Sequence, residues 1–184
     1  MFVLNIKEKV LWNEKDQEFV TISPYTIKIE HSLLSIRKWE SKWHKPFMSQ
    51  VQKSQAEQKD YVRCMTVGYE LPEEVYATLD TQEMNEVFTY MNEPMTATWF
   101  SDNDQKQAKS RMGGETVTYE IVYYWMSKLN IPYECEKWHI NSLMTLIKVS
   151  MLKEQPSKKM SKRDVMSQNR ALNEQRKAKM KSKG

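Results

Sequence analysis

The sequence has few of the residues and runs that mark membrane, secreted or nucleotide-binding proteins. Only two of its 184 residues are cysteine and four are glycine. Two cysteines do not build a disulfide framework, and no apolar run approaches the ~20 residues that span a bilayer. The opening residues, MFVLNIKEKVLW, lack the charged start, long apolar stretch and small-residue cleavage site of a signal peptide. We therefore expect a reduced, cytoplasmic protein that does not contact membranes.

The sequence also lacks the local signatures of catalysis. No Gly-x-Ser-x-Gly elbow is present, and the pair Gly113-Gly114 is not followed by the Lys-Ser/Thr of a phosphate-binding loop. Cys64 has no nucleophile signature around it. The adjacent acids Glu73 and Glu74 fall in the first turn of a predicted helix, where the helix dipole accounts for them. The sequence therefore predicts no enzyme and no cofactor.

One pair of residues has the spacing of metal ligands. Cys135 and His139 are four residues apart in a predicted helix, so they would share a face. A structural zinc site normally needs four protein ligands, and the remaining histidines, His31 and His44, have no paired spacing. We expect a buried thiol and a half-buried histidine rather than a metal site.

What the sequence does have is enough apolar material for one core and an uneven distribution of charge. Hydrophobic residues make up 40% of the 22.0 kDa chain, which suits a single domain with an appendage. Residues 153–184 hold eleven bases and three acids, a net charge of +8, whereas residues 1–152 have a net charge of −4. An acidic body with a basic tail is typical of an interaction arm, although a tail that only solubilises remains an alternative.

Residues 1–31 are predicted to form a β-hairpin. The run at residues 2–12 is rich in valine, leucine and isoleucine, and residues 25–29 alternate apolar and polar side chains. The polar residues 13–16 between the runs can turn. Pro24 indicates an edge position or a break. A hairpin alone is marginal in water, so it must pack on the body or pair with another chain.

Residues 32–152 are predicted to form a helical body. Ser32 is placed to cap a first helix, which Pro46 ends, and apolar residues around Tyr61 indicate a second, short helix that Gly68 ends.

Two further helix starts and one loop are predicted in the middle of the body. Pro72, followed by two glutamates, suits the first position of a helix. Another helix is predicted to start at Thr81 because apolar residues follow at helical spacing. Residues 101–114 are polar, end in two glycines and are predicted to be a flexible loop.

The end of the body is predicted to be an antiparallel αα-hairpin. Its helices cover residues 116–129 and 134–152, with a tight connection at residues 130–132. The apolar stripe of the first helix comprises Val117, Ile121, Tyr124, Trp125 and Leu129. The buried face of the second comprises Trp138, Leu143, Leu146, Ile147 and Met151.

Residues 153–184 are predicted to be a helical or disordered basic tail. They are rich in helix formers and sparse in apolar groups, so a helix there should fray or become ordered on a partner. The tail has no aromatic residue for stacking on bases, which disfavours nucleic acid as a partner. The whole chain is thus predicted to be α+β and mainly α-helical.

Five stretches, in their order and spacing, resemble a family of small proteins from long-tailed (siphovirus-type) bacteriophages, the tail assembly chaperones. They are IEHSLLSIRKWESKWHKPF (29–47), DYVRCMT (60–66), EPMTATWFS (93–101), IVYYWMSKLNIPYECEKWHINSLMTLIKV (121–149) and KKMSKRDVMSQNRALNEQRKAKMKSKG (158–184). The resemblance implies a protein that binds the tape-measure protein, keeps it soluble and helps recruit tail-tube subunits. It also implies a location in the host cell cytoplasm and absence from the mature virion.

Thirteen methionines are a high count, and methionine is common on surfaces that accept varied apolar partners. With the resemblance, this gives a set of candidate partner-binding residues: Trp39, Trp43, Phe47, Met160, Lys162, Arg163, Met166, Arg170, Arg176 and Lys177. The alternative for the three aromatic residues is core packing between the β-hairpin and the first helix.

Two other classes of protein remain open. A virion structural protein, a tail or head–tail component, could use the hairpin to augment a sheet of a neighbouring subunit. A nucleic-acid-binding accessory protein could work through residues 153–184. Self-association is also left open.

Overall fold

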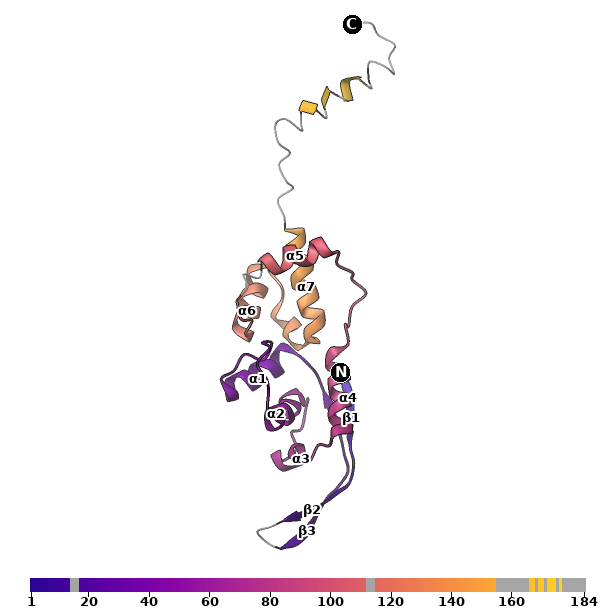
Figure 1. Ribbon diagram of the computed structural model, residues 1–184, viewed down its shortest axis with the longest axis vertical. Helices are drawn as coiled ribbons and strands as arrows, with labels where there is room; N and C mark the ends of the chain where they lie inside the picture. Colours follow the sequence, from indigo (N-terminus) through magenta and orange to yellow (C-terminus); the bar gives the residue numbers. More distant parts are fainter. Residues whose placement is uncertain are drawn as a thin grey trace. The chain divides into compact units, whose positions relative to one another are not determined.

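The computed structural model describes residues 1–13, 17–111 and 115–154, together with residues 166, 167, 169, 170, 172–174 and 176. The chain divides into two compact units, Met1–Leu152 and Lys153–Gly184, which we describe separately. Strands open the first unit and helices complete it (Figure 1), so the predicted α+β, mainly helical class is confirmed.

The N-terminal strands form one long antiparallel hairpin that is interrupted in the middle. Strand β1 (Phe2–Ile6) pairs with β4 (Tyr25–Ile29), and β2 (Lys9–Asn13) pairs with β3 (Glu18–Ile22). We call the first pair the root sheet and the second the distal ribbon. The interruption on the returning side contains Pro24, whose ring removes a backbone donor, so the predicted break is confirmed.

The root sheet packs one face on the core. Leu4, Ile6, Ile27 and Ile29 are buried, and the residues between them point outward. Helix α4 packs against β1, where the rings of Phe2 and Tyr90 stack with centroids 5.2 Å apart. The outer edge of β4 is paired with residues 65–67. There the Glu30 N–H donates to the Met65 carbonyl and the Val67 N–H donates to the Lys28 carbonyl.

Four helices follow the sheet: α1 (Leu33–Trp43), α2 (Gln55–Met65), α3 (Glu73–Ala77) and α4 (Thr81–Asn92). The side chains of Ser32, Ser54 and Asp80 cap α1, α2 and α4, each in a reciprocal capping box. The predicted cap at Ser32 and the start at Thr81 are confirmed. Helix α2 begins earlier than the apolar pattern indicated, because Ser54 and Glu57 cap a polar first turn.

The predicted flexible loop at residues 101–114 is wrong for most of its length, since residues Asp102–Arg111 form helix α5. A fourth capping arrangement explains the difference. The Asp104 N–H donates to Ser101 Oγ at 3.2 Å, and the Ser101 N–H donates to Asp104 Oδ2 at 3.1 Å. The helix is polar, but it buries Ala108. Residues 112–114 of the predicted loop lie outside the described residues.

The C-terminal helical pair has a longer joint than predicted. Helix α6 (Tyr119–Lys128) is followed by the 3-10 helix η1 (Tyr133–Lys137), and α7 (Ile140–Lys153) begins six residues later than expected. The predicted burial of Trp138 and Tyr124 is wrong: both are largely exposed. Trp138 is exposed because it sits where the chain is extended between η1 and α7. On α6 the buried face is formed by Val122, Trp125 and Met126 instead.

Candidate functional site

The three aromatic residues predicted to contact a partner lie in or against the core. Trp39 is fully buried and donates its Nε1–H to the Glu57 carbonyl at 2.8 Å. Phe47 is half-buried and stacks on Tyr61 with ring centroids 3.9 Å apart. Trp43 is half-buried beside them. Trp39 therefore has no surface to offer a partner, and the cluster joins α1 to α2 rather than the hairpin to α1.

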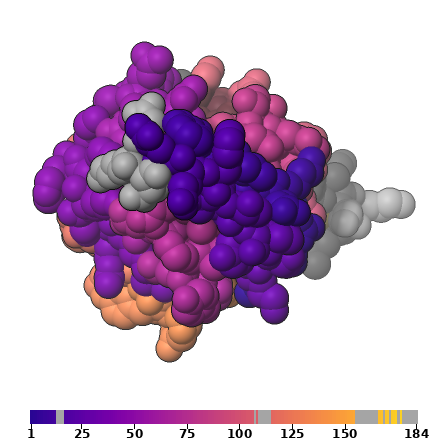
Figure 2. Space-filling model, turned by 90° about the horizontal axis from the view of Figure 1, so that it is seen from below, coloured from indigo at the N-terminus to yellow at the C-terminus, as the bar shows by residue number. Residues whose placement is uncertain are grey.

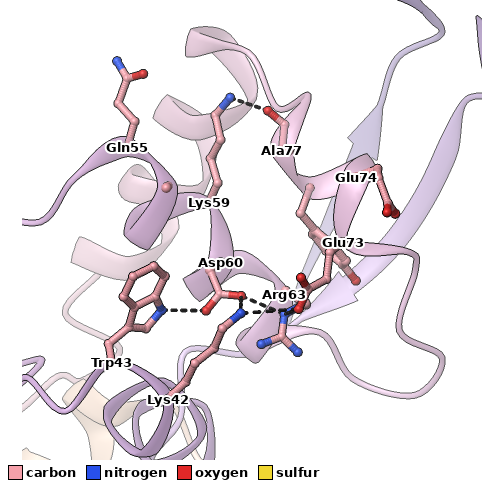
Figure 3. Close-up of a pocket in the computed structure, with 11 residues that line it drawn as sticks. Lys42, Trp43, Gln55, Lys59, Asp60, Arg63, Glu73, Glu74 and Ala77 are labelled. Atoms are coloured by element: carbon pink, nitrogen blue, oxygen red, sulfur yellow. Dashed lines mark hydrogen bonds and ion pairs between the residues drawn. The ribbon is translucent and has the colours of Figure 1, made fainter. Parts of the chain in front are cut away.

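A cleft of about 550 Å³ lies between α1, α2 and α3. Figure 3 shows Trp43, Lys42 and Arg63 converging on Asp60. That carboxylate accepts hydrogen bonds from Trp43 Nε1 (2.7 Å), Lys42 Nζ (2.9 Å) and Arg63 Nε (2.8 Å). Burial alone would raise the pKa of Asp60, but the hydrogen bonds from Arg63, Lys42 and Trp43 outweigh it and lower that pKa.

The charges of this cleft neutralise one another. Lys42 and Arg63 also approach Glu73, at 3.3 and 3.6 Å, and Lys59 donates to the Ala77 carbonyl at 2.6 Å. The bases in the cleft are thus bonded to groups of the same body. The ion pairs among Lys42, Asp60, Arg63 and Glu73 tie three helices together.

A second cluster brings together two histidines that are distant in sequence. The rings of His31 and His139 lie 5.2 Å apart between centroids, and His31 Nδ1 is 2.6 Å from the hydroxyl of Tyr61. Burial, with the nearby His139, lowers the pKa of His31 to about 3. Burial also lowers the pKa of His139. Both imidazoles are therefore neutral at pH 7 and join the first strands to α7, with the Ile140 N–H donating to the His31 carbonyl at 2.7 Å.

Metal binding has little support among the residues that the structure describes. They contain no group of three or more His, Cys, Asp or Glu side chains arranged to hold a metal ion. The predicted pairing of Cys135 and His139 on one helix is wrong, because Cys135 lies in η1 and His139 lies in the bridge that precedes α7. Cys135 itself is buried, as expected.

The most unusual surface is the distal ribbon. The sequence indicated that the hairpin could pair with another chain, but it did not single out Trp12 or Phe19. Phe19 and Trp12 are 72% and 52% exposed, and their rings contact each other edge to face with centroids 4.9 Å apart. Val10, Leu11 and Val20 are exposed as well. Figure 1 shows the ribbon extending beyond the helices, and Figure 2 shows the N-terminal hairpin, in indigo, on the molecular surface. Contiguous exposed apolar side chains of this kind mark interaction sites.

The ribbon is fixed to the body at its base by one lysine. Lys9 Nζ donates to the Thr78 carbonyl at 2.7 Å and to Glu83 Oε2 at 2.5 Å. The other oxygen of Glu83 accepts the Lys7 N–H at 3.1 Å, and Glu83 is buried. The interruption between the root sheet and the distal ribbon is therefore held by the first turn of α4. The direction of the ribbon is set by the body.

The predicted partner-binding residues of the tail are only partly described. Met166, Arg170 and Arg176 are exposed and helical, and Met166 is 74% exposed. The remaining members of the predicted set lie outside the described residues: Met160, Lys162, Arg163 and Lys177.

Among the described residues, no helix combines the length and apolarity that crossing a membrane requires. Comparisons with known proteins found no family model, curated protein or solved structure that matches the chain. The fold and surface define a small α+β protein with an exposed apolar β-ribbon.

Proposed function

We propose that this protein is a tail assembly chaperone of long-tailed bacteriophages and not an enzyme. It binds the tape-measure protein in the host cell cytoplasm, keeps it soluble and helps recruit tail-tube subunits. Two independent lines support this function. One is the resemblance of the five sequence stretches, and the other is the exposed apolar ribbon.

The observation that carries the proposal is the exposure of the distal ribbon. Phe19, Trp12 and their aliphatic neighbours are held in water by a hairpin whose base is bonded to the body. An isolated two-stranded ribbon is marginally stable. Keeping such apolar side chains exposed therefore makes sense when a partner covers them. A long, aggregation-prone client offers the apolar segments that would do so.

The basic tail has a supporting part in the proposal. Its described residues expose Met166 together with Arg170 and Arg176, which combines an apolar contact with positive charge. Charged groups around an apolar contact steer association and keep a transient complex soluble.

The experiment that tests the function is mass spectrometry of purified virions beside an infected-cell lysate, with this chain quantified against the major tail protein. The proposal predicts a chain that is abundant in the lysate and absent from particles. A fixed stoichiometry in particles would instead make it a virion structural component, and a chain equally abundant in lysate but never co-purifying with the tape-measure protein would also contradict the proposal.

A further inference from the structure

The backbone edges of the distal ribbon are unpaired, whereas residues 65–67 pair with the β4 edge of the root sheet. Among the described residues, strands β2 and β3 make backbone hydrogen bonds only with each other. In a two-stranded antiparallel ribbon, alternate N–H and C=O groups of each strand point away from the partner strand. These groups form a template for another strand.

Of the two edges, that of β3 is the more accessible. The side of β2 is approached at its base by the body, since Lys9 is bonded to Thr78 and Glu83. No hydrogen bond or ion pair reaches the described residues of β3 from outside the ribbon, and only Ile22 packs against the core. Strand β3 is five residues long and four of them are exposed.

Both faces of the ribbon are apolar, which restricts what can be added. From the register, Val10, Trp12 and Phe19 share one face, and Leu11, Val20 and Ile22 share the other. Consecutive side chains of a strand added at the edge of β3 would lie alternately on the two faces of the ribbon. Its matching sequence is therefore a continuous apolar run, like that of a strand buried on both faces. An alternating apolar and polar strand would match only one face.

The charge at the exposed end of β3 indicates which residues should stand next to that apolar run. Glu18, the first residue of β3, is exposed at the end of the strand away from Lys9. Lys9 is already bonded to Glu83. Among the described residues of β2 and β3 the free charge is thus negative, and it complements a lysine or arginine next to the apolar run.

We infer that the outer edge of β3 accepts an extended partner segment as a third strand, and that this segment is an apolar run of about five residues flanked by lysine or arginine. The inference rests on the proposed function, because it specifies which segments of a client protein the ribbon takes. It places the main-chain edge, rather than the side chains alone, at the centre of recognition.

The test uses the full chain and a fluorescein-labelled synthetic peptide with alternating valine and isoleucine, as long as β3, between paired lysines. Binding is followed by fluorescence anisotropy. Three altered peptides are measured beside it. One is flanked by glutamates. The other two carry backbone N-methyl groups, one on its odd-numbered residues and the other on its even-numbered residues. Added strands bond through one parity only. We expect N-methylation of one parity to weaken binding at least about tenfold and of the other to have little effect.

A charge-reversing substitution in the protein tests the preference for lysine next to the apolar run. Glu18→Lys should weaken binding of the lysine-flanked peptide and strengthen binding of the glutamate-flanked one. Glu86→Lys, which makes the same charge change at an exposed position of α4, should alter neither.

Two outcomes would overturn the inference: an equal loss with both N-methylated peptides, or an unchanged preference in Glu18→Lys. If either occurs while the tape-measure protein still co-purifies with this chain, the edge-pairing inference fails and the proposed function stands. If the tape-measure protein does not co-purify with the unmodified chain either, the result contradicts the proposed function itself.

Discussion

The root sheet and the distal ribbon are two halves of one hairpin with opposite environments. In the root, Leu4 and Ile29 are completely buried, α4 packs against β1, and residues 65–67 pair with the edge of β4. In the ribbon, Phe19 is 72% exposed and both edges are open among the described residues. The strands are equally long and similarly apolar. Burial is therefore decided by what the body places beside each half and not by the composition of the strands.

This difference separates the residues that stabilise the fold from those available to a partner. Burial of apolar area stabilises the root, whereas the ribbon leaves that area in water for another protein to cover. Changes in the root should lower the free energy of unfolding. Changes in the ribbon should leave stability almost intact and alter binding.

The largest effect on stability is expected in the root. Leu4→Ala removes a fully buried side chain and should lower the free energy of unfolding by about 2–5 kcal/mol, measured by urea denaturation. The matched substitution in the ribbon, Leu11→Ala, should cost far less because its side chain is partly exposed. Equal costs at the two positions would mean that the ribbon is buried in the free protein.

The next effect is expected at the junction between the two halves. Glu83→Ala leaves Lys9 without its buried carboxylate and removes one partner of the Asp80 capping box. We expect a loss of about 1–3 kcal/mol in the free energy of unfolding. Amide hydrogen exchange in the ribbon should also become faster. Asn85→Ala, at an exposed position of the same helix, serves as the control and should change neither quantity.

Acid should weaken the root region selectively. His31 lies two residues after the end of β4, and burial lowers its pKa from 6.5 to about 3. The unfolded chain therefore binds more protons between these values, so the free energy of unfolding falls as the pH is lowered through this window. The limiting slope for one such group is about 1.4 kcal/mol per pH unit.

The variant His31→Gln should reduce this slope between pH 6.5 and pH 5, the upper part of that window, in urea denaturation series. His44→Asn alters an exposed histidine in a left-handed backbone position that asparagine tolerates, so it should keep the slope of the original protein. A flat dependence in the unmodified protein would show that His31 is not buried as described.

The smallest effect on stability is expected for the most exposed ribbon residue. Phe19→Ser should change the free energy of unfolding by no more than about 0.5 kcal/mol, since the side chain is already in water. Thermal and urea denaturation measure this directly. A large loss would assign Phe19 to the fold through its edge-to-face contact with Trp12.

The sequence predicted features whose determinants are local. The alternation over residues 25–29 gave the buried face of β4, and Ser32 gave the start of α1. Helix α5 was missed although its signal was also local, because Ser101 and Asp104 form a cap in a stretch that looked like a loop. The pair Gly113-Gly114, which favoured a loop, comes in the sequence after the last residue of the helix, Arg111.

The sequence indicated that the hairpin could pair with another chain, but its exposed residues could not be predicted because their signal is not local. The residues of β2 and β3 have the pattern of core strands, and only the position of the helices leaves Trp12 and Phe19 exposed. For Trp39 the sequence left partner binding and core packing open, and the structure buries it against α2. The meeting of His31 and His139 likewise depends on long-range packing.

The most direct test of the central claim is co-expression with the tape-measure protein, with the soluble tape-measure protein that co-purifies quantified for each variant. Phe19→Ser in the ribbon is compared with Tyr69→Ser, which removes an aromatic side chain that is 79% exposed elsewhere on the body. The account predicts that Phe19→Ser folds normally and loses most of the co-purified tape-measure protein, whereas Tyr69→Ser retains it. Full retention by a folded Phe19→Ser variant would contradict the assignment of the distal ribbon as the binding surface.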